Sequence, residues 1–318
     1  MAHDRGRPID WLIFIGLGLM WGSSYLFIMF GLDTLTPFTL VALRLLIGGV
    51  LLGAVVLVAR EPAPRDRRTY GHLAVMSVLN IVLPFSLITW AELAVPSSLA
   101  SILTATVPLF VIIIAAAALR DEPITLNRVG GLAIGFAGVI LLTARGPMAG
   151  EGGLLPQLAL LGAAASYGAG AVYARRNVKG LRPMVPAAFQ VGFAFVIAGA
   201  LALVFERPFD LRPDVMAIAS IVWLGLFGSG LAYLAFFRLL GTWGATRTSM
   251  VAYLMPLVGI GLGVVVASEP ISWQMVAGTA LIIGGVALVN ARIGQRRLFG
   301  RPPVASGPGA GLAPRRLG

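Results

Sequence analysis

Residues 122–145 read EPITLNRVGGLAIGFAGVILLTAR, and residues 269–292 read EPISWQMVAGTALIIGGVALVNAR. The two stretches lie 147 residues apart, begin with the same Glu-Pro-Ile, carry glycines at matching positions and end with the same Ala-Arg. Further upstream, Ser101 and Pro108 align with Ser249 and Pro256 once a one-residue gap is allowed. A pattern that recurs at a fixed interval indicates an internal repeat, so one unit is expected to occur twice in the chain.

The composition around these stretches is that of a membrane protein. Of the 318 residues, 58% are apolar and 12% are charged, and the mean hydropathy is +0.90. An ordinary soluble domain carries about 25% charged residues, so this class is excluded. The chain has no cysteine, which excludes a disulfide framework and a thiolate metal site.

Ten apolar segments are long enough to cross a bilayer, which takes about 20 residues. The first five cover 11–30, 36–59, 71–91, 97–119 and 126–144, and the second five cover 154–174, 184–205, 213–237, 244–267 and 273–292. Each repeat, 11–145 and 153–292, therefore holds five helices. Because five is odd, equivalent helices cross the bilayer in opposite directions and the repeats are inverted.

We predict an all-α polytopic membrane protein with ten transmembrane helices arranged as two inverted five-helix repeats. Inverted repeats around a site at the bilayer midplane are typical of secondary transporters, although a duplicated unit could also form a larger membrane scaffold. Residues 1–10 are expected to form a cytoplasmic N-terminal segment. Residues 293–318 are rich in Gly, Pro and Arg and are expected to be a disordered cytoplasmic tail.

The net charge of +11 could suggest nucleic acid, but its distribution indicates membrane orientation instead. With the N-terminus in the cytoplasm, 20 of the 24 Lys and Arg residues fall in inner segments, whereas the outer segments hold Arg145, Arg207 and Arg212. Arg44 is the only cation well inside a span. Since basic residues collect on the cytoplasmic side, both termini are expected inside, and no nucleic-acid partner is expected.

Several short motifs resemble a known family when they are taken in order. They are Met20-Trp21-Gly22-Ser23-Ser24, Ala42-Leu43-Arg44, Asp121-Glu122-Pro123 and Ser268-Glu269-Pro270. Residues 11–292 resemble the EamA family of the drug/metabolite transporter superfamily. The resemblance implies ten helices with both termini inside, and export of small polar metabolites such as amino acids across the bacterial inner membrane. Repeat two departs from the pattern, with Tyr167-Gly168-Ala169 for Trp21-Gly22-Ser23 and Gln190 for Arg44, so any site is asymmetric.

Pro108 and Pro256 are expected near the centres of the fourth and ninth helices. A proline there has no N–H group, so one backbone carbonyl of the preceding turn loses its helical hydrogen bond. At membrane depth an unpaired carbonyl is tolerated only where it is buried in protein or lines a water-filled cavity. Ser97, Ser101, Thr104 and Pro108 share one helical face, and with Ser249 and Tyr253 they predict a polar cavity lining. Alternatively, the prolines only kink the helices and the hydroxyls bond within their own turns.

Arg44 could bind a carboxylate or phosphate of the substrate with two hydrogen bonds. It could instead pair with Glu92 at the outer end of the third helix. The second, structural role is favoured, because Arg44 belongs to the family pattern whatever the substrate. A cation at this depth costs several kcal/mol unless it is hydrated or paired.

Aromatic and amide side chains within the spans complete the candidate set. Rings over a cavity can hold an organic cation or an apolar side chain, but packing is an alternative for each ring. Asn80 and Gln190 could equally hold helices together. The predicted substrate-binding residues are Trp21, Ser24, Tyr25, Arg44, Asn80, Ser101, Thr104, Pro108, Tyr167, Tyr233, Ser249, Tyr253 and Pro256, and they place the site between helices 1, 3, 4, 6, 8 and 9.

The predicted function is a secondary transporter of small polar metabolites, with an organic-cation or multidrug exporter as the alternative and a scaffold or membrane enzyme as weaker ones. No cofactor or metal is expected. The expected partners are a small-molecule substrate and the lipid bilayer, and a homodimer is left open. All acidic residues fall in tails, loops or helix ends, which favours facilitated diffusion or exchange over a carboxylate relay, with Glu92 the only alternative proton site.

Overall fold

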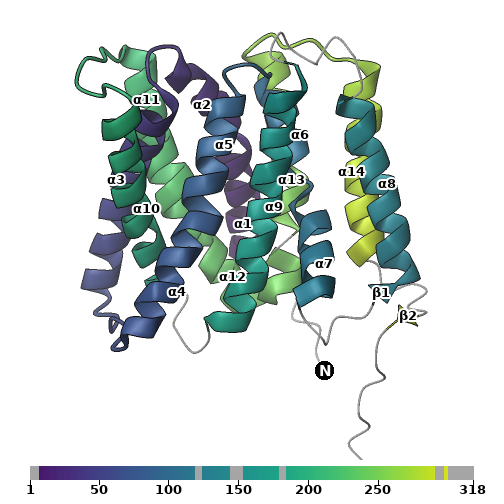
Figure 1. Cartoon of the computed structure of the whole chain (residues 1–318), viewed down its shortest axis with the longest axis horizontal. Helices are drawn as coiled ribbons and strands as arrows, with labels where there is room; N and C mark the ends of the chain where they lie inside the picture. Colours follow the sequence, from purple (N-terminus) through teal and green to yellow (C-terminus); the bar gives the residue numbers. More distant parts are fainter. Residues whose placement is uncertain are drawn as a thin grey trace, which may run out of the picture.

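The computed structural model describes residues 7–118, 124–143, 153–178, 184–248, 250–290 and 297–299. These residues form a bundle of roughly aligned helices (Figure 1). The first repeat region contains α1 (Pro8–Gly22), α2 (Ser24–Leu32), α3 (Pro37–Val58), α4 (Arg67–Ser77), η1 (Val78–Val82), α5 (Leu83–Ala91), α6 (Ser97–Thr104), α7 (Val107–Ala118), β1 (Ile124–Thr125) and α8 (Leu126–Thr143). The second contains α9 (Leu154–Asn177), α10 (Met184–Phe205), α11 (Val215–Trp223), η2 (Leu224–Leu231), α12 (Ala232–Thr248), α13 (Val251–Val265) and α14 (Trp273–Asn290), and is followed by β2 (Arg297–Phe299).

Ten apolar helical stretches correspond to the ten expected spans. Within the described residues, eight are long and apolar enough to cross a membrane, and two, Val251–Val265 and Trp273–Val289, are shorter. The expected boundary between the eighth and ninth spans, at residues 238–243, is wrong because α12 continues to Thr248. Gly241 and Gly244 weaken a helix but do not stop it as a proline would, which explains the error.

Two spans are interrupted where an unbroken helix was expected. The first is divided at Ser23, between α1 and α2, and the fourth at Ala105 and Thr106, between α6 and α7. Pro108 is therefore the second residue of α7 and not the centre of a long helix, a position where the missing N–H costs nothing. Pro256 lies inside α13 as expected.

The third and eighth spans each contain a π-helical segment, η1 and η2. A shift of 147 residues places Val78–Val82 on 225–229, inside η2, so the two segments occupy equivalent positions of the sequence repeat. Single π-helical turns within α-helices are rare and frequently occur at functional sites. The two π-helical segments therefore indicate that the middle of these two spans is a candidate functional region.

α8 and α14 pack against each other at one side of the bundle (Figure 1). A Cβ on Gly131 would lie 2.5 Å from the carbonyl oxygen of Gly285, and a Cβ on Gly138 would lie 2.8 Å from that of Gly278. Since the lower-numbered glycine of one helix meets the higher-numbered glycine of the other, the two helices are antiparallel. These glycines are packing positions that let the backbones approach closely.

The antiparallel pair also explains a short sheet. The end of α14 returns to the beginning of α8, where β1 pairs with β2 in antiparallel fashion and Ile124 faces Phe299. Residues 297–299, which form β2, belong to the tail for which disorder is expected. The remaining tail residues, 293–296 and 300–318, lie outside the described residues.

Candidate functional site

Arg44 on α3 is buried in the middle of the bundle, with 4% of its surface exposed. Its Nε donates a hydrogen bond to the Ser229 hydroxyl over 3.2 Å, and its Cζ lies 4.3 Å from the centroid of the Phe85 ring. A guanidinium over an aromatic face gains about 0.5–2 kcal/mol. Because both oxygens of Glu92 lack a hydrogen-bond partner, the expected Arg44–Glu92 pair is wrong, and Ser229 and Phe85 take its place.

Tyr25 on α2 and Thr104 on α6 are joined by a hydrogen bond of 2.6 Å between their hydroxyl groups. The Thr104 hydroxyl also lies 2.7 Å from the carbonyl oxygen of Ala100, which can only accept. Thr104 therefore donates its single proton to that carbonyl, and Tyr25 donates to Thr104. This contact holds two interrupted spans together, α1–α2 and α6–α7, at the level of the first break.

Trp21 at the end of α1 is the second aromatic residue of this region. Its Nε1 donates to the carbonyl oxygen of Gly228 over 3.3 Å, and its ring meets that of Tyr233 edge to face with 6.4 Å between centroids. Tyr233 on α12 and Tyr167 on α9 are both near enough to Arg44 to interact with it electrostatically. The first repeat and the second thus both contribute to the surroundings of the buried cation.

Ser24 lies beside Arg44 but bonds within its own helix, where its hydroxyl donates to the carbonyl of Met20 over 2.9 Å. A Cβ on Gly228 would lie 3.0 Å from the Ser24 hydroxyl and 3.1 Å from an Nη of Arg44. The bare backbone of Gly228 therefore faces both side chains. We call these residues the central cluster: Trp21, Ser24, Tyr25, Arg44, Phe85, Thr104, Tyr167, Gly228, Ser229 and Tyr233.

The other sequence-predicted residues lie elsewhere. Asn80, in η1, donates to the side-chain carbonyl of Gln190 over 3.1 Å, as expected of an amide that holds helices together. Ser101 donates to the carbonyl of Ser98 and faces Gly259, so its hydroxyl bonds within its own turn. Tyr253 packs near Leu109 and Val286, in a separate apolar cluster with α7 and α14. Ser249 lies outside the described residues.

Sequence reasoning missed three members of the central cluster: Phe85, Gly228 and Ser229. The segment that contains the last two, Gly225-Leu-Phe-Gly-Ser-Gly230, has three glycines in the middle of a span, and this is a signal of close backbone approach. The structure also brings helix 2 into the site through Arg44. The predicted contribution of helix 9 is not found in the cluster among the described residues.

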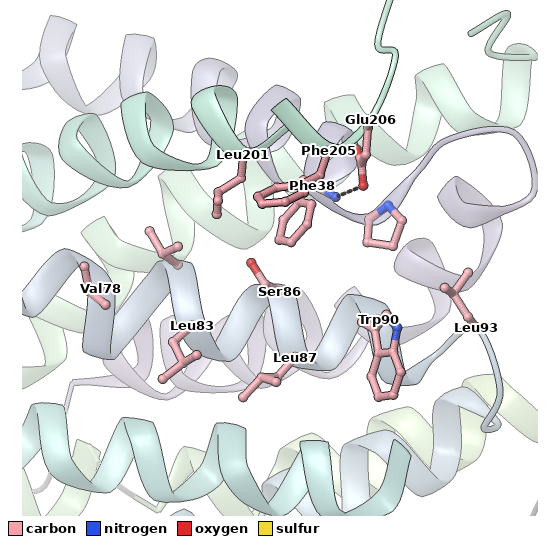
Figure 2. Close-up of a pocket in the computed structure, with 12 residues that line it drawn as sticks. Phe38, Val78, Leu83, Ser86, Leu87, Trp90, Leu93, Leu201, Phe205 and Glu206 are labelled. Atoms are coloured by element: carbon pink, nitrogen blue, oxygen red, sulfur yellow. Dashed lines mark hydrogen bonds between the residues drawn. The ribbon is translucent and has the colours of Figure 1, made fainter. Parts of the chain in front are cut away.

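A groove of about 540 Å³ lies between α5 and α10 (Figure 2). Its rim residues Trp90, Leu93 and Phe205 are 42%, 55% and 71% exposed, so it belongs to the perimeter of the bundle. No residue of the central cluster lines it. The lining residues are Pro37, Phe38, Val78, Val82, Leu83, Ser86, Leu87, Trp90, Leu93, Leu201, Phe205 and Glu206.

The sequence profile of the EamA-like transporter family matches residues 9–144 and again residues 154–291. The chain belongs to this family. Like other EamA-like transporters, it is an integral membrane protein, and the family is one of transporters. The two matched segments coincide with the two halves that the sequence repeat defines.

Similar proteins come from bacteria and plants. The uncharacterized transporter YvbV of Bacillus subtilis is 28% identical over 88% of this EamA-like chain and 91% of its own, and the uncharacterized inner membrane transporter YedA of Escherichia coli is 28% identical over 91% and 92%. A WAT1-related chloroplastic protein of Arabidopsis thaliana is 25% identical over 91% of this chain and 71% of its own. A solved crystal structure with 23% identity and a TM-score of 0.61, covering 89% of this chain and 96% of its own, shares the fold.

Proposed function

We propose that this EamA-like protein is a secondary transporter that exports small carboxylate-bearing metabolites, amino acids or related compounds, by alternating access. The proposal places the substrate in the central cluster, with its carboxylate on Arg44. It places the protein in the bacterial inner membrane with both termini in the cytoplasm, in keeping with the distribution of Lys and Arg and with the printed name of YedA.

The observation that carries the proposal is the incomplete bonding of a buried arginine. A guanidinium has five N–H donors in a planar fork, and within the described residues Arg44 uses Nε on Ser229 and places its face on Phe85. No carboxylate pairs with it among these residues. A carboxylate of the substrate would supply both the missing charge and two acceptors for the Nη groups.

Two features support alternating access between similar halves. α8 and α14, which derive from equivalent stretches of the repeat, are antiparallel, as inverted repeats require. The π-helical segments η1 and η2 also fall at equivalent positions, and η2 contributes Ser229 to the central cluster. Exchange of conformation between two such halves would open the same central cluster to either side of the membrane in turn.

An organic-cation exporter is the second candidate, and the aromatic groups of the central cluster favour it. Trp21 lies edge to face with Tyr233 and 5.6 Å from Phe236, measured between ring centroids. Such rings can bind a quaternary ammonium group. Arg44 weighs against this candidate, because its positive charge would repel an organic cation at the same position.

The test is uptake of labelled compounds into inside-out membrane vesicles, with a panel of amino acids, dicarboxylates and quaternary ammonium ions. We expect transport of at least one carboxylate, a large loss of its apparent affinity in Arg44→Gln, and partial retention in Arg44→Lys, which keeps the charge but loses the planar fork. Arg67→Gln, which removes an exposed arginine at the start of α4, is the control. If quaternary ammonium ions are transported, and are transported faster by Arg44→Gln than by the parent protein, the organic-cation exporter replaces the carboxylate exporter as the proposed function.

A further inference from the structure

Three glutamates lie at one end of the bundle, which we call the glutamate end. Glu206 follows α10, Glu269 precedes α14, and Glu92 follows Ala91, the last residue of the third span. Glu206 accepts hydrogen bonds from the backbone N–H groups of Phe38 and Thr39 at the start of α3. Glu269 likewise accepts from the backbone N–H groups of Ser97 and Ser98 and from the Ser97 hydroxyl at the start of α6. Both carboxylates thus accept hydrogen bonds from the otherwise unpaired N–H groups of a helix N-terminus.

Glu92 is in the opposite situation. Its side chain is 7% exposed, and neither carboxylate oxygen has a hydrogen-bond partner within the described part of the chain. A buried carboxylate without donors loses its hydration and gains nothing in return, so its neutral form is favoured. The sequence places Glu92 at a helix end, where water is normally available, but its side chain is buried, as are those of Ala91 before it and Val95 after it in the chain.

Three titratable groups lie near enough to act on Glu92: Glu269 before α14, Arg44 on α3 and Tyr25 on α2. α5, α6 and the neighbouring half of α9 add no charged side chain. Burial raises the pKa of the Glu92 carboxyl well above its ordinary value, Glu269 raises it further, and Arg44 lowers it. Glu92 is therefore subject to opposite electrostatic influences from Glu269 and from the buried arginine of the central cluster.

We propose that Glu92 is a proton-binding site whose protonation is coupled to closure of the glutamate end. The carboxyl takes up one proton from the adjacent solution when this end of the bundle closes over it. It returns the proton to water when the end opens. The inference rests on the two alternating conformations of the proposed function. It assigns a ligand, the proton, to a residue outside the central cluster. Closure is then favoured by acid on that side of the membrane, with a maximum of tenfold in the opening equilibrium per pH unit for one proton.

The test uses single cysteines, because the chain has none of its own. Val95→Cys places a thiol at a buried position three residues from Glu92, and Phe209→Cys places one at a position that is 89% exposed in the same structure. The purified full-length protein in detergent is labelled with a maleimide between pH 5.5 and 8.5. The ratio of the two labelling rates removes the intrinsic pH dependence of the thiol.

We expect the ratio to rise with pH in the parent protein by several-fold per unit, up to tenfold. In Glu92→Gln, which carries the shape of the neutral carboxyl, the ratio should be low and independent of pH. Asp210→Asn, an exposed carboxylate elsewhere at the same end, should leave the rise unchanged. Glu92→Met is a second uncharged variant in case Glu92→Gln does not give a monodisperse protein.

A ratio that is constant in the parent protein, or that rises equally in both Glu92 variants, would overturn the proposal. The labelling needs no substrate, so its result is separate from that of the transport assay. A pH-dependent ratio together with failure to transport any carboxylate would refute the proposed function and leave the proton site standing. Carboxylate transport together with a labelling ratio that does not change with pH would refute the proton site and support the proposed function.

Discussion

Arg44 and Ser229 lie 185 residues apart in the sequence, yet the Nε of the arginine donates a hydrogen bond to the serine hydroxyl over 3.2 Å. The two residues lie in the two different segments that match the family profile, on α3 and η2. The contact therefore fixes the guanidinium relative to the second half of the chain. Ser229 belongs to the π-helical segment η2, and its hydroxyl accepts this bond from α3.

The first prediction concerns Gly228, the neighbour of Ser229. In Gly228→Ala the new methyl group would lie 3.0 Å from the Ser24 hydroxyl and 3.1 Å from an Nη of Arg44, so one of these groups must move. We expect the apparent affinity for a transported carboxylate to fall about tenfold, which is about 1.4 kcal/mol, with little change in thermal stability. Gly192→Ala, where nothing lies within 4 Å, is the control in the same vesicle assay.

The second prediction concerns the hydrogen bond between Tyr25 and Thr104. Tyr25→Phe and Thr104→Val each remove one hydroxyl, and a buried hydrogen bond contributes about 0.5–1.5 kcal/mol to stability. We expect the two changes to be less than additive in the double variant, by about that amount, when unfolding is measured in detergent. Simple additivity would show that the 2.6 Å contact contributes nothing to stability.

The third prediction tests the packing of α8 against α14. In Gly131→Ala the methyl group would lie 2.5 Å from the Gly285 carbonyl oxygen and 2.9 Å from the backbone nitrogen of Val289, neither of which can rotate away. We expect a loss of about 1–3 kcal/mol in the free energy of unfolding. Gly199→Ala, inside α10 with nothing within 4 Å, should leave the stability unchanged or raise it by up to about 1 kcal/mol. Equal melting temperatures for the two variants would show that this helix pair is loose.

The sequence predicted the apolar helices and the α8–α14 glycines because both depend on local composition and on the repeat. It also named seven residues of the central cluster, since polar and aromatic side chains are conspicuous in apolar spans. Interruptions at Ser23 and at Ala105 were not foreseen, because neither residue is a strong helix breaker. Their positions are set by packing against other helices.

The partner of Arg44 could not be predicted for a related reason. Charge alone favours Glu92, but Ser229 is 185 residues from Arg44, and contacts over such a separation depend on how the helices pack together. The burial of Glu92 does not follow from its position at a helix end, because position along a helix is an incomplete measure of hydration. Neighbouring segments can cover a helix end as completely as its middle.

The last prediction concerns the effect of Glu92 on stability as a function of pH. Its ordinary pKa is 4.5, and burial raises the pKa in the folded protein. Below pH 4.5 the carboxyl is protonated in the folded and unfolded chains alike, so its contribution is complete. Above pH 4.5 the unfolded chain ionises while the folded chain keeps its proton, so the free energy of unfolding falls, by at most about 1.4 kcal/mol per pH unit.

Glu92→Gln cannot ionise in either state, so its stability relative to the parent protein should increase steadily as the pH is raised from 4.5 towards 8. Denaturant unfolding of both proteins in the same detergent at several pH values measures this difference and cancels the titration of all other groups. If the Glu92→Gln difference is constant with pH, the carboxyl has the same proton affinity folded and unfolded, and Glu92 is hydrated in the native protein.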